Sequence, residues 1–374
     1  MKNVRYMMAI TIVMSLDFFT SIEMIYFMEK GLPLSKIYML YSIFSVLIVL
    51  LEVPSGYIGD KIGYKTCLCI GYLLGFAGTI GFLIGHSFAA MCVSYFFMAL
   101  MASLLSGTEE ALIYDSLLEY NEEFKFESIY SKIKSYGYAA TIIGSILAGV
   151  IAEIDITLNP ICNGIAIIIS LLLLQRIEMP NKNLVHEEVQ MERCNVWEEC
   201  HNLWGILLMS GLFMTSTLIG TKFSQPLMIA GAIPLSFFGV FSAICSLVNM
   251  AASYFAPKFV KIPFITIMLI PSAILCIIGL SGNGRFVLLL IITAAFRAIG
   301  NVKLTATLND KINNHSNYRA TINSIKSLLF RLFYAGVILI AGFISDKSIY
   351  ISIAVCGFCL SVGILILGHI EKNK

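Results

Sequence analysis

The sequence predicts an all-α, polytopic membrane protein with twelve transmembrane helices in two six-helix bundles. Of its 374 residues, 58% are hydrophobic and only 13% are charged, whereas about a quarter of the residues in a soluble domain are charged. The mean hydropathy is +0.85. A chain this apolar cannot hide its surface in one water-soluble core, so we expect it to lie in lipid.

Twelve apolar runs long enough to cross a bilayer follow one another along the chain. A helix needs about 20 apolar residues to span the hydrocarbon core. The predicted helices are residues 5–28, 36–59, 66–85, 88–114, 133–153, 159–177, 203–223, 232–255, 262–281, 285–308, 321–344 and 349–369. No small-residue cleavage site follows the first run, so we interpret it as a retained helix and not as a signal peptide.

The polar stretch 178–202 is the longest interruption between these runs. It divides the chain into one bundle in residues 1–177 and another in residues 203–374, and we expect it to be a cytoplasmic loop. Cytoplasmic loops carry an excess of Lys and Arg. With a cytoplasmic N-terminus, sixteen basic residues fall in inner segments and five in outer ones. This asymmetry predicts that both termini are cytoplasmic.

Short similarities between the two parts favour an internal repeat. Ile133-Lys134-Ser135 recurs as Ile325-Lys326-Ser327, 192 residues later, and Gly144 corresponds to Gly336 at the same offset. We therefore expect two related bundles about an axis along the membrane normal.

The stretch Glu52–Thr66, EVPSGYIGDKIGYKT, joins the second and third predicted helices by a tight loop. Its glycines permit close backbone approach and left-handed conformations. Its acid lies beside bases at a helix end, where a charge network can hold two helices together. The residues of this pattern are Glu52, Gly56, Asp60, Lys61, Gly63 and Lys65.

This spacing, G-x-x-x-D-K-x-G-x-K, resembles the loop between helices two and three in the major facilitator superfamily of secondary transporters. The resemblance implies the fold predicted above and makes these six residues a conformational latch. The alternative is an ordinary cytoplasmic hairpin held by a surface salt bridge.

Charged residues at membrane depth are costly and are candidates for function. Asp17 lies near the middle of the first predicted helix, Arg297 of the tenth and Arg331 of the eleventh. In the superfamily, helices one, four, seven and ten line a central cavity. The resemblance therefore places Asp17 and Arg297 at a substrate or proton site, with Arg331 behind them. A buried structural ion pair is the alternative.

The fourth predicted helix ends in Gly107-Thr-Glu109-Glu110-Ala-Leu-Ile-Tyr-Asp115. Adjacent helical residues point about 100° apart, so the two glutamates cannot share one role. One of them suits a proton carrier, and solvation by headgroup water at the inner interface is the alternative. The resemblance gives Asp115 the role of accepting charge from the latch.

The fifth helix contains Gly144-Ser-Ile-Leu-Ala-Gly149. This is a partial match to the G-P-x-x-G-G pattern of facilitator exporters, with Ser145 for the proline and Ala148 for the first paired glycine. The match favours export, and close helix packing explains the glycines equally well.

Several classes of protein are not supported by the sequence. The five histidines lie at helix ends or in loops, which predicts no metal site. The segment Gly59–Thr66 lacks the Gly-Lys-Ser/Thr adjacency of a phosphate loop. Nucleic-acid patterns and a nucleophile–base pair in the membrane are also missing. We therefore expect no cofactor, no nucleic-acid partner and no enzymatic activity.

These observations lead to one hypothesis. The protein is a monomeric, multi-pass transporter of the cell membrane that exports a small amphipathic or drug-like molecule in exchange for protons. Proton-coupled uptake of a sugar or organic anion is one alternative. A transport-dead relative that acts as a membrane sensor or scaffold is the other.

Overall fold

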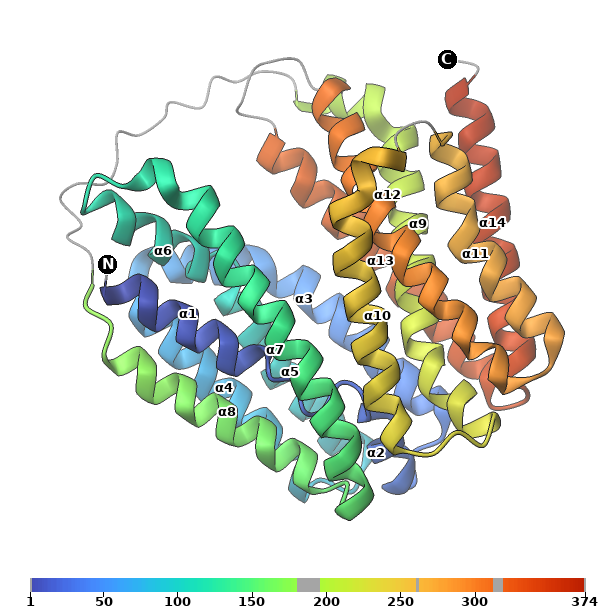
Figure 1. The fold of residues 1–374 in the computed structure, drawn as a ribbon, viewed down its shortest axis with the longest axis horizontal. Coiled ribbons are helices and arrows are strands. Elements are labelled where there is room, and N and C mark those ends of the chain that lie inside the picture. Colours follow the sequence, from blue (N-terminus) through green and yellow to red (C-terminus); the bar gives the residue numbers. More distant parts are fainter. Residues whose placement is uncertain (1, 180–195, 260–261, 312–318, 373–374) are drawn as a thin grey trace. The chain divides into compact units, whose positions relative to one another are not determined.

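The computed structural model describes residues 2–179, 196–259, 262–311 and 319–372, and within these ranges all regular structure is helical (Figure 1). The α-helices are α1 (Lys2–Ser15), α2 (Glu23–Glu29), α3 (Leu34–Ile62), α4 (Tyr64–Ile84), α5 (Phe88–Leu105), α6 (Thr108–Leu118), α7 (Phe126–Ile154), α8 (Leu158–Gln175), α9 (Val196–Ala230), α10 (Ser236–Phe255), α11 (Phe264–Ser281), α12 (Leu290–Lys311), α13 (Arg319–Ser345) and α14 (Ile349–Lys372). Short 3₁₀-helices are η1 (Glu123–Lys125), η3 (Ala256–Phe259) and η4 (Gly284–Leu289). The all-α prediction is confirmed.

Eleven helical spans in the described residues are long and apolar enough to cross a membrane. The predicted first helix, 5–28, is not among them, because it is divided into α1 and α2. A continuous helix over residues 5–28 is therefore wrong, and the count of twelve spans stays a prediction. Apart from the fourth predicted helix, the other helices are found with shifted ends; α9, for example, already begins at Val196, inside the stretch predicted as a loop.

Asp17 causes the break between α1 and α2. Its Oδ1 accepts hydrogen bonds from the backbone amides of Phe19 (3.1 Å) and Thr20 (3.0 Å). A short acidic side chain that binds nearby amides in this way competes with helical hydrogen bonds. Asn159 of α8 holds the same segment, because its Nδ2 donates to the carbonyl oxygen of Phe18 at 2.7 Å.

Gly144 of α7 allows a close approach to this break. A Cβ atom at this position would lie 2.9 Å from the backbone of Leu16 and Asp17. Gly336, its counterpart at the 192-residue offset, has open space where its Cβ would be. The two glycines therefore do not share a packing role.

The predicted fourth helix, 88–114, is also divided. It consists of α5 and α6, which together form one apolar span from Phe88 to Leu118. Gly107 lies between them with φ +75°, a left-handed conformation that glycine adopts without strain. The continuous helix that we predicted there is wrong for this reason.

The hairpin between α3 and α4 is tighter than the predicted loop of residues 60–65. α3 ends at Ile62 and α4 begins at Tyr64, so Gly63 alone separates them. Its φ is +83°, which confirms that a glycine supplies a left-handed turn here.

The chain forms two compact units where the structure describes it. Unit 1 is Met1–Lys30, Ile43–Val189 and Leu235–Ala243, and unit 2 is Gly31–Ser42, Gln190–Pro234 and Ile244–Lys374. Both α3 and α10 therefore contribute residues to each unit. The predicted boundary at 178–202 and the predicted repeat axis stay predictions.

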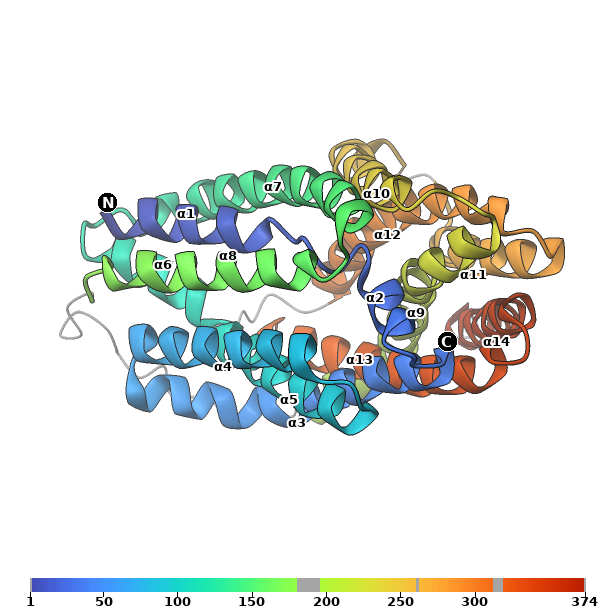
Figure 2. The same ribbon diagram turned by 90° about the horizontal axis from the view of Figure 1, so that it is seen from below.

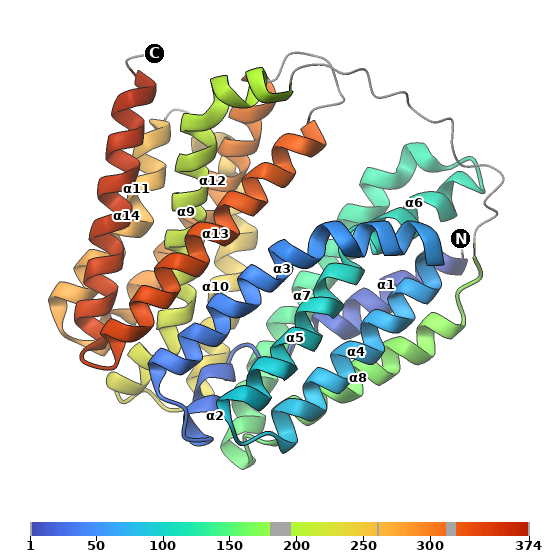
Figure 3. The same cartoon turned by 180° about the vertical axis from the view of Figure 1, so that it is seen from behind.

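Each unit has its own buried core. In unit 1, α1 packs against α7 and α8, and α4 packs against α5 and α8 (Figure 2). Met7, Leu68 and Ile113 lie at its centre. In unit 2, α9 packs against α13 and α14, and α11 packs against α14 (Figure 3). Phe213 and Met268 are fully buried there.

Candidate functional site

The break at Gly107 places Glu109 and Glu110 in the first turn of α6. The first amides of a helix have no partner within it, and the helix dipole is positive at this end. Carboxylates are therefore favoured here although they lie inside an apolar span. A continuous helix would offer them no such amides.

Glu109 faces α4. The hydroxyl of Tyr72 donates to its Oε1 at 3.2 Å, and Tyr72 is fully buried. Lys134 of α7 is close enough to interact electrostatically with the same carboxylate. Glu109 itself is half-buried.

Glu110 faces α7 instead. The hydroxyl of Tyr130 donates to Glu110 Oε1, and the Nζ atom of Lys134 lies 4.9 Å from the centre of the Tyr130 ring. The two glutamates thus bind different helices, as their 100° separation predicts. Each carboxylate has a phenolic O–H that can donate to it, an arrangement that suits binding and release of a proton.

The sequence analysis missed Tyr72 and Tyr130. Both occur in segments that we interpreted only by their hydropathy and charge. The signal available was chemical, because a buried tyrosine hydroxyl needs a hydrogen-bond partner, and few polar groups lie in the neighbouring spans.

Asp17, Arg297 and Arg331 are half-buried. Asp17 lies in the break between α1 and α2, where it binds the two backbone amides given above. Arg297 lies within α12 and Arg331 within α13, both uninterrupted helices of unit 2. The pairing of Asp17 with Arg297 stays a prediction.

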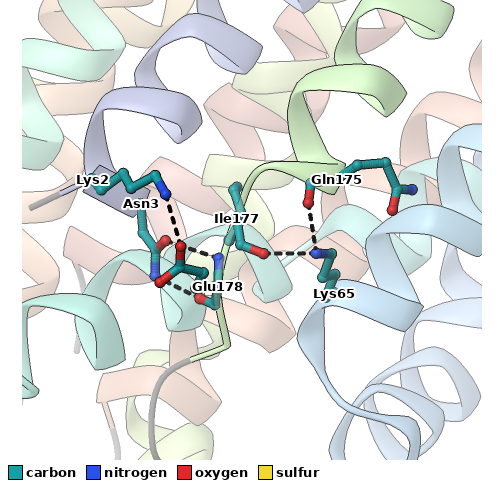
Figure 4. A network of polar contacts seen from close by, with 6 residues as sticks. All are labelled: Lys2, Asn3, Lys65, Gln175, Ile177 and Glu178. Carbon is teal, nitrogen blue, oxygen red and sulfur yellow. Dashed lines mark hydrogen bonds and ion pairs between the residues drawn. The ribbon is translucent and has the colours of Figure 1, made fainter.

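Among the proposed latch residues, Lys65 has defined partners. Its Nζ donates to the carbonyl oxygens of Gln175 (3.0 Å) and Ile177 (2.7 Å), at the C-terminal end of α8 (Figure 4). A cation is favoured there by unpaired carbonyls and by the helix dipole. Lys65 therefore joins the start of α4 to the end of α8.

The other latch residues have less defined surroundings. Glu52 and Lys61 are exposed, and Asp115 is half-buried in α6. Gly56 and Asp60 lie in the last turns of α3, and their surroundings are outside the described part of the structure. The latch role of these residues stays a prediction.

A polar network beside Lys65 ties the start of α1 to the end of α8 (Figure 4). Lys2 Nζ lies 2.7 Å from Glu178 Oε1. Asn3 Nδ2 donates to the carbonyl of Glu178 at 2.7 Å and to Ser116 Oγ at 3.2 Å. The contact with Lys2 lowers the pKa of Glu178, and Glu178 in turn raises the pKa of Lys2. Sequence reasoning did not anticipate this network.

These features define a helical, multi-pass membrane protein with charged groups held inside apolar spans, the kind of architecture found in secondary transporters. The sequence profile of the Major Facilitator Superfamily matches residues 7–335. The chain belongs to that superfamily. Together with the eleven candidate spans of its described residues, this membership makes it a multi-pass membrane protein.

Individual relatives resemble parts or all of the chain. It is 26% identical over 121 residues to the quinolone resistance protein NorA of Staphylococcus aureus, and the match covers 32% of this chain and 29% of NorA. The crystal structure of the nucleoside transporter NupG has a TM-score of 0.79 and 11% identity, with all of both chains covered. A POT family transporter in complex with 5-aminolevulinic acid has a TM-score of 0.74 and 12% identity, covering 100% of this chain and 96% of that one. At these identities the solved structures show a shared fold.

Proposed function

We propose that the protein is a monomeric, proton-coupled exporter of a small amphipathic or drug-like molecule that works by alternating access. The observation that carries this proposal is the arrangement of Glu109 and Glu110. Both carboxylates lie at a helix break inside an apolar span, and each accepts a hydrogen bond from a tyrosine of another helix. Glu109 is half-buried there and Glu110 is exposed. A charge at membrane depth is costly, so these acids are candidates for function.

The proton step takes place at one of these carboxylates. A proton that enters from outside binds to the carboxylate oxygen, and the neutral acid no longer attracts Lys134 or accepts as strongly from its tyrosine. Release of the proton to the cytoplasm restores those interactions. Because binding favours one conformation over the other, the proton shifts the balance between outward-open and inward-open states.

Arg297 is the residue that we propose for holding an anionic group of the substrate. The apolar spans between Leu203 and Ile370 contain basic residues but no Asp or Glu, and this excess of positive charge suits an anionic group of a substrate. The likeness to part of NorA supports export over uptake.

Everted membrane vesicles with a pH-sensitive dye provide the test, with norfloxacin and ethidium as probes. We expect substrate-dependent proton flux in the native protein. Glu109→Gln or Glu110→Gln should lower it at least about tenfold, as removal of an acid–base group does. Glu119→Gln is the matched control, because Glu119 is an exposed acid directly after α6, and its flux should be unchanged.

Two results would contradict the proposal. Unchanged flux in the Glu109→Gln/Glu110→Gln double variant would remove both residues from the proton step, and Asp17→Asn would then be tested. Uptake of nucleosides or peptides into right-side-out vesicles, without export of either probe, would reverse the proposed direction.

A further inference from the structure

Two short sequence patterns occur twice in the chain, at related places in the fold. Pro33-Leu34-Ser35 begins α3, and Pro234-Leu235-Ser236 begins α10. A glycine followed four residues later by an acid occurs at the end of α7, as Gly149 and Glu153. The same pattern recurs at the end of α13, as Gly342 and Asp346, 193 residues later.

In unit 1, the end of α7 binds the start of α10. The backbone amide of Ser236 donates to Glu153 Oε1 at 3.0 Å. Gly149 makes this approach possible, because a Cβ atom there would lie 2.7 Å from the carbonyl oxygen of Ser236. The acid thus satisfies a first-turn amide at the positive end of α10.

In unit 2, the end of α13 binds the start of α3 in the same way. The backbone amide of Ser35 donates to Asp346 Oδ1 at 3.0 Å. A Cβ atom at Gly342 would lie 3.2 Å from Ser35 Cα and 3.0 Å from Tyr38 Cβ. Glycine, acid and serine therefore have the same relative roles in both contacts.

Neither contact is a local consequence of the chain path. The bonded residues are 83 apart in the first contact and 311 apart in the second. Moreover, α3 and α10 are the two described helices whose residues are divided between the compact units. The same contact is thus repeated at the start of both divided helices.

We infer that Glu153 and Asp346 are positioning residues that hold the starts of α10 and α3 in one transport state and release them in the other. This inference rests on the proposed alternating-access function. Both carboxylates are exposed, so breaking either hydrogen bond leaves no charge buried, and the contacts are weak enough to open during a transport cycle. The expected topology puts both contacts on the outer face of the membrane.

Neighbouring acids do not share this geometry. Asp155 lies two residues after Glu153 and is also exposed, but its Oδ1 accepts from the amide (2.8 Å) and the hydroxyl (2.7 Å) of Thr157. It therefore binds its own loop and not a distant helix. This makes Asp155 a matched control for the charge of the segment.

Hydrogen–deuterium exchange of the full chain in lipid nanodiscs tests the contacts directly. Glu153→Ala should speed exchange in residues 236–242 about tenfold, the effect expected from one lost hydrogen bond, and leave residues 35–41 unchanged. Asp346→Ala should speed exchange in residues 35–41 and leave residues 236–242 unchanged. Glu153→Gln and Asp346→Asn keep an oxygen that accepts the bond, so most protection should remain. Asp155→Ala should change neither segment.

A positioning role requires a second effect, at the other end of α3. When the starts of α3 and α10 are released, the Glu153→Ala/Asp346→Ala variant should populate the opposite transport state and slow exchange in residues 58–66, the hairpin between α3 and α4.

If exchange at the helix starts does not change, the contacts do not exist in the membrane. If the starts loosen but residues 58–66 do not respond, the acids are helix caps only, and the inference is wrong. The absence of transport with every probe would instead contradict the proposed function, because these exchange measurements need no substrate.

Discussion

Unit 1 and unit 2 hold their membrane charges in different ways. In unit 1, Asp17, Glu109 and Glu110 lie at helix breaks, whereas in unit 2, Arg297 and Arg331 lie in uninterrupted helices. Asp17 accepts from two backbone amides at its break, whereas Glu109 and Glu110 lie in the first turn of α6, at the positive end of its dipole, and accept from Tyr72 and Tyr130. An arginine carries its own donors on a long stem and can reach polar partners from an intact helix. Helix breaks thus accompany these three acidic residues of unit 1.

The largest difference between the units should appear at the paired glycines Gly144 and Gly336. Gly144→Ala places a methyl group against the backbone of the α1–α2 break. This should lower the free energy of unfolding by about 2 kcal/mol, as overpacking does. Gly336→Ala enters open space, and alanine is the better helix former, so a gain of about 0.5 to 1 kcal/mol is expected. Unfolding by denaturing detergent, followed by circular dichroism, measures both. Equal effects of the two substitutions would show that the break is not packed as described.

A smaller loss of stability is expected at Gly107, where substitution should affect both the backbone conformation and the proton flux. Gly107→Ala forces a left-handed conformation on an L-residue and should cost about 1 to 2 kcal/mol. Gly282, with φ +60° at the end of α11, is the matched control in unit 2. Both alanine variants should lose similar stability in thermal unfolding, but only Gly107→Ala should also lower proton flux, because it shifts Glu109 and Glu110. Equal proton flux in the two variants would show that the helix break at Gly107 is not needed for the proton step.

The smallest effect concerns the exposed pair Lys2–Glu178. The pKa of Glu178 is lowered from 4.5, so its stabilisation is present above that value and is lost as the pH falls through the lowered pKa. The pKa of Lys2 is raised from 10.5, so the stabilisation that protonated Lys2 contributes is present below that value and is lost only as the pH rises through the raised pKa. The melting temperature of the native protein should therefore exceed that of Glu178→Gln slightly at pH 7, and the difference should shrink as the pH falls below 4.5. Glu119→Gln serves as the control. A difference that is constant between pH 3 and pH 7 would contradict an ionic origin.

The sequence was sufficient for the broad fold and for some local geometry. Hydropathy located most of the spans, and the glycines of Glu52–Thr66 predicted a tight turn between the second and third helices. It could not locate the breaks at Asp17 and Gly107, because a window average takes no account of one side chain that binds two amides or of one backbone angle. Tyr72 and Tyr130 contributed to apolar segments, so their hydroxyl groups were not considered as partners for Glu109 and Glu110.

Partners distant in the sequence were beyond pattern reasoning for a related reason. Lys65 fits a family motif that implies an acidic partner, whereas its partners in the structure are two backbone carbonyls of α8, and carbonyls have no sequence signature. The equivalence of Glu153 and Asp346 was detectable in principle. The sequence patterns that indicate a repeat lie 192 residues apart, however, whereas Glu153 and Asp346 lie 193 residues apart.

The bond between Lys2 and Glu178 also has a meaning for biogenesis. It joins residues 176 positions apart, so the first helix cannot complete its contacts until the ribosome has made α8. At common elongation rates this takes roughly 10 to 35 seconds. During that interval α1 lies in the bilayer or at the insertion machinery without its contact to α8. Formation of the Lys2–Glu178 bond is therefore a late event in the assembly of the nascent protein.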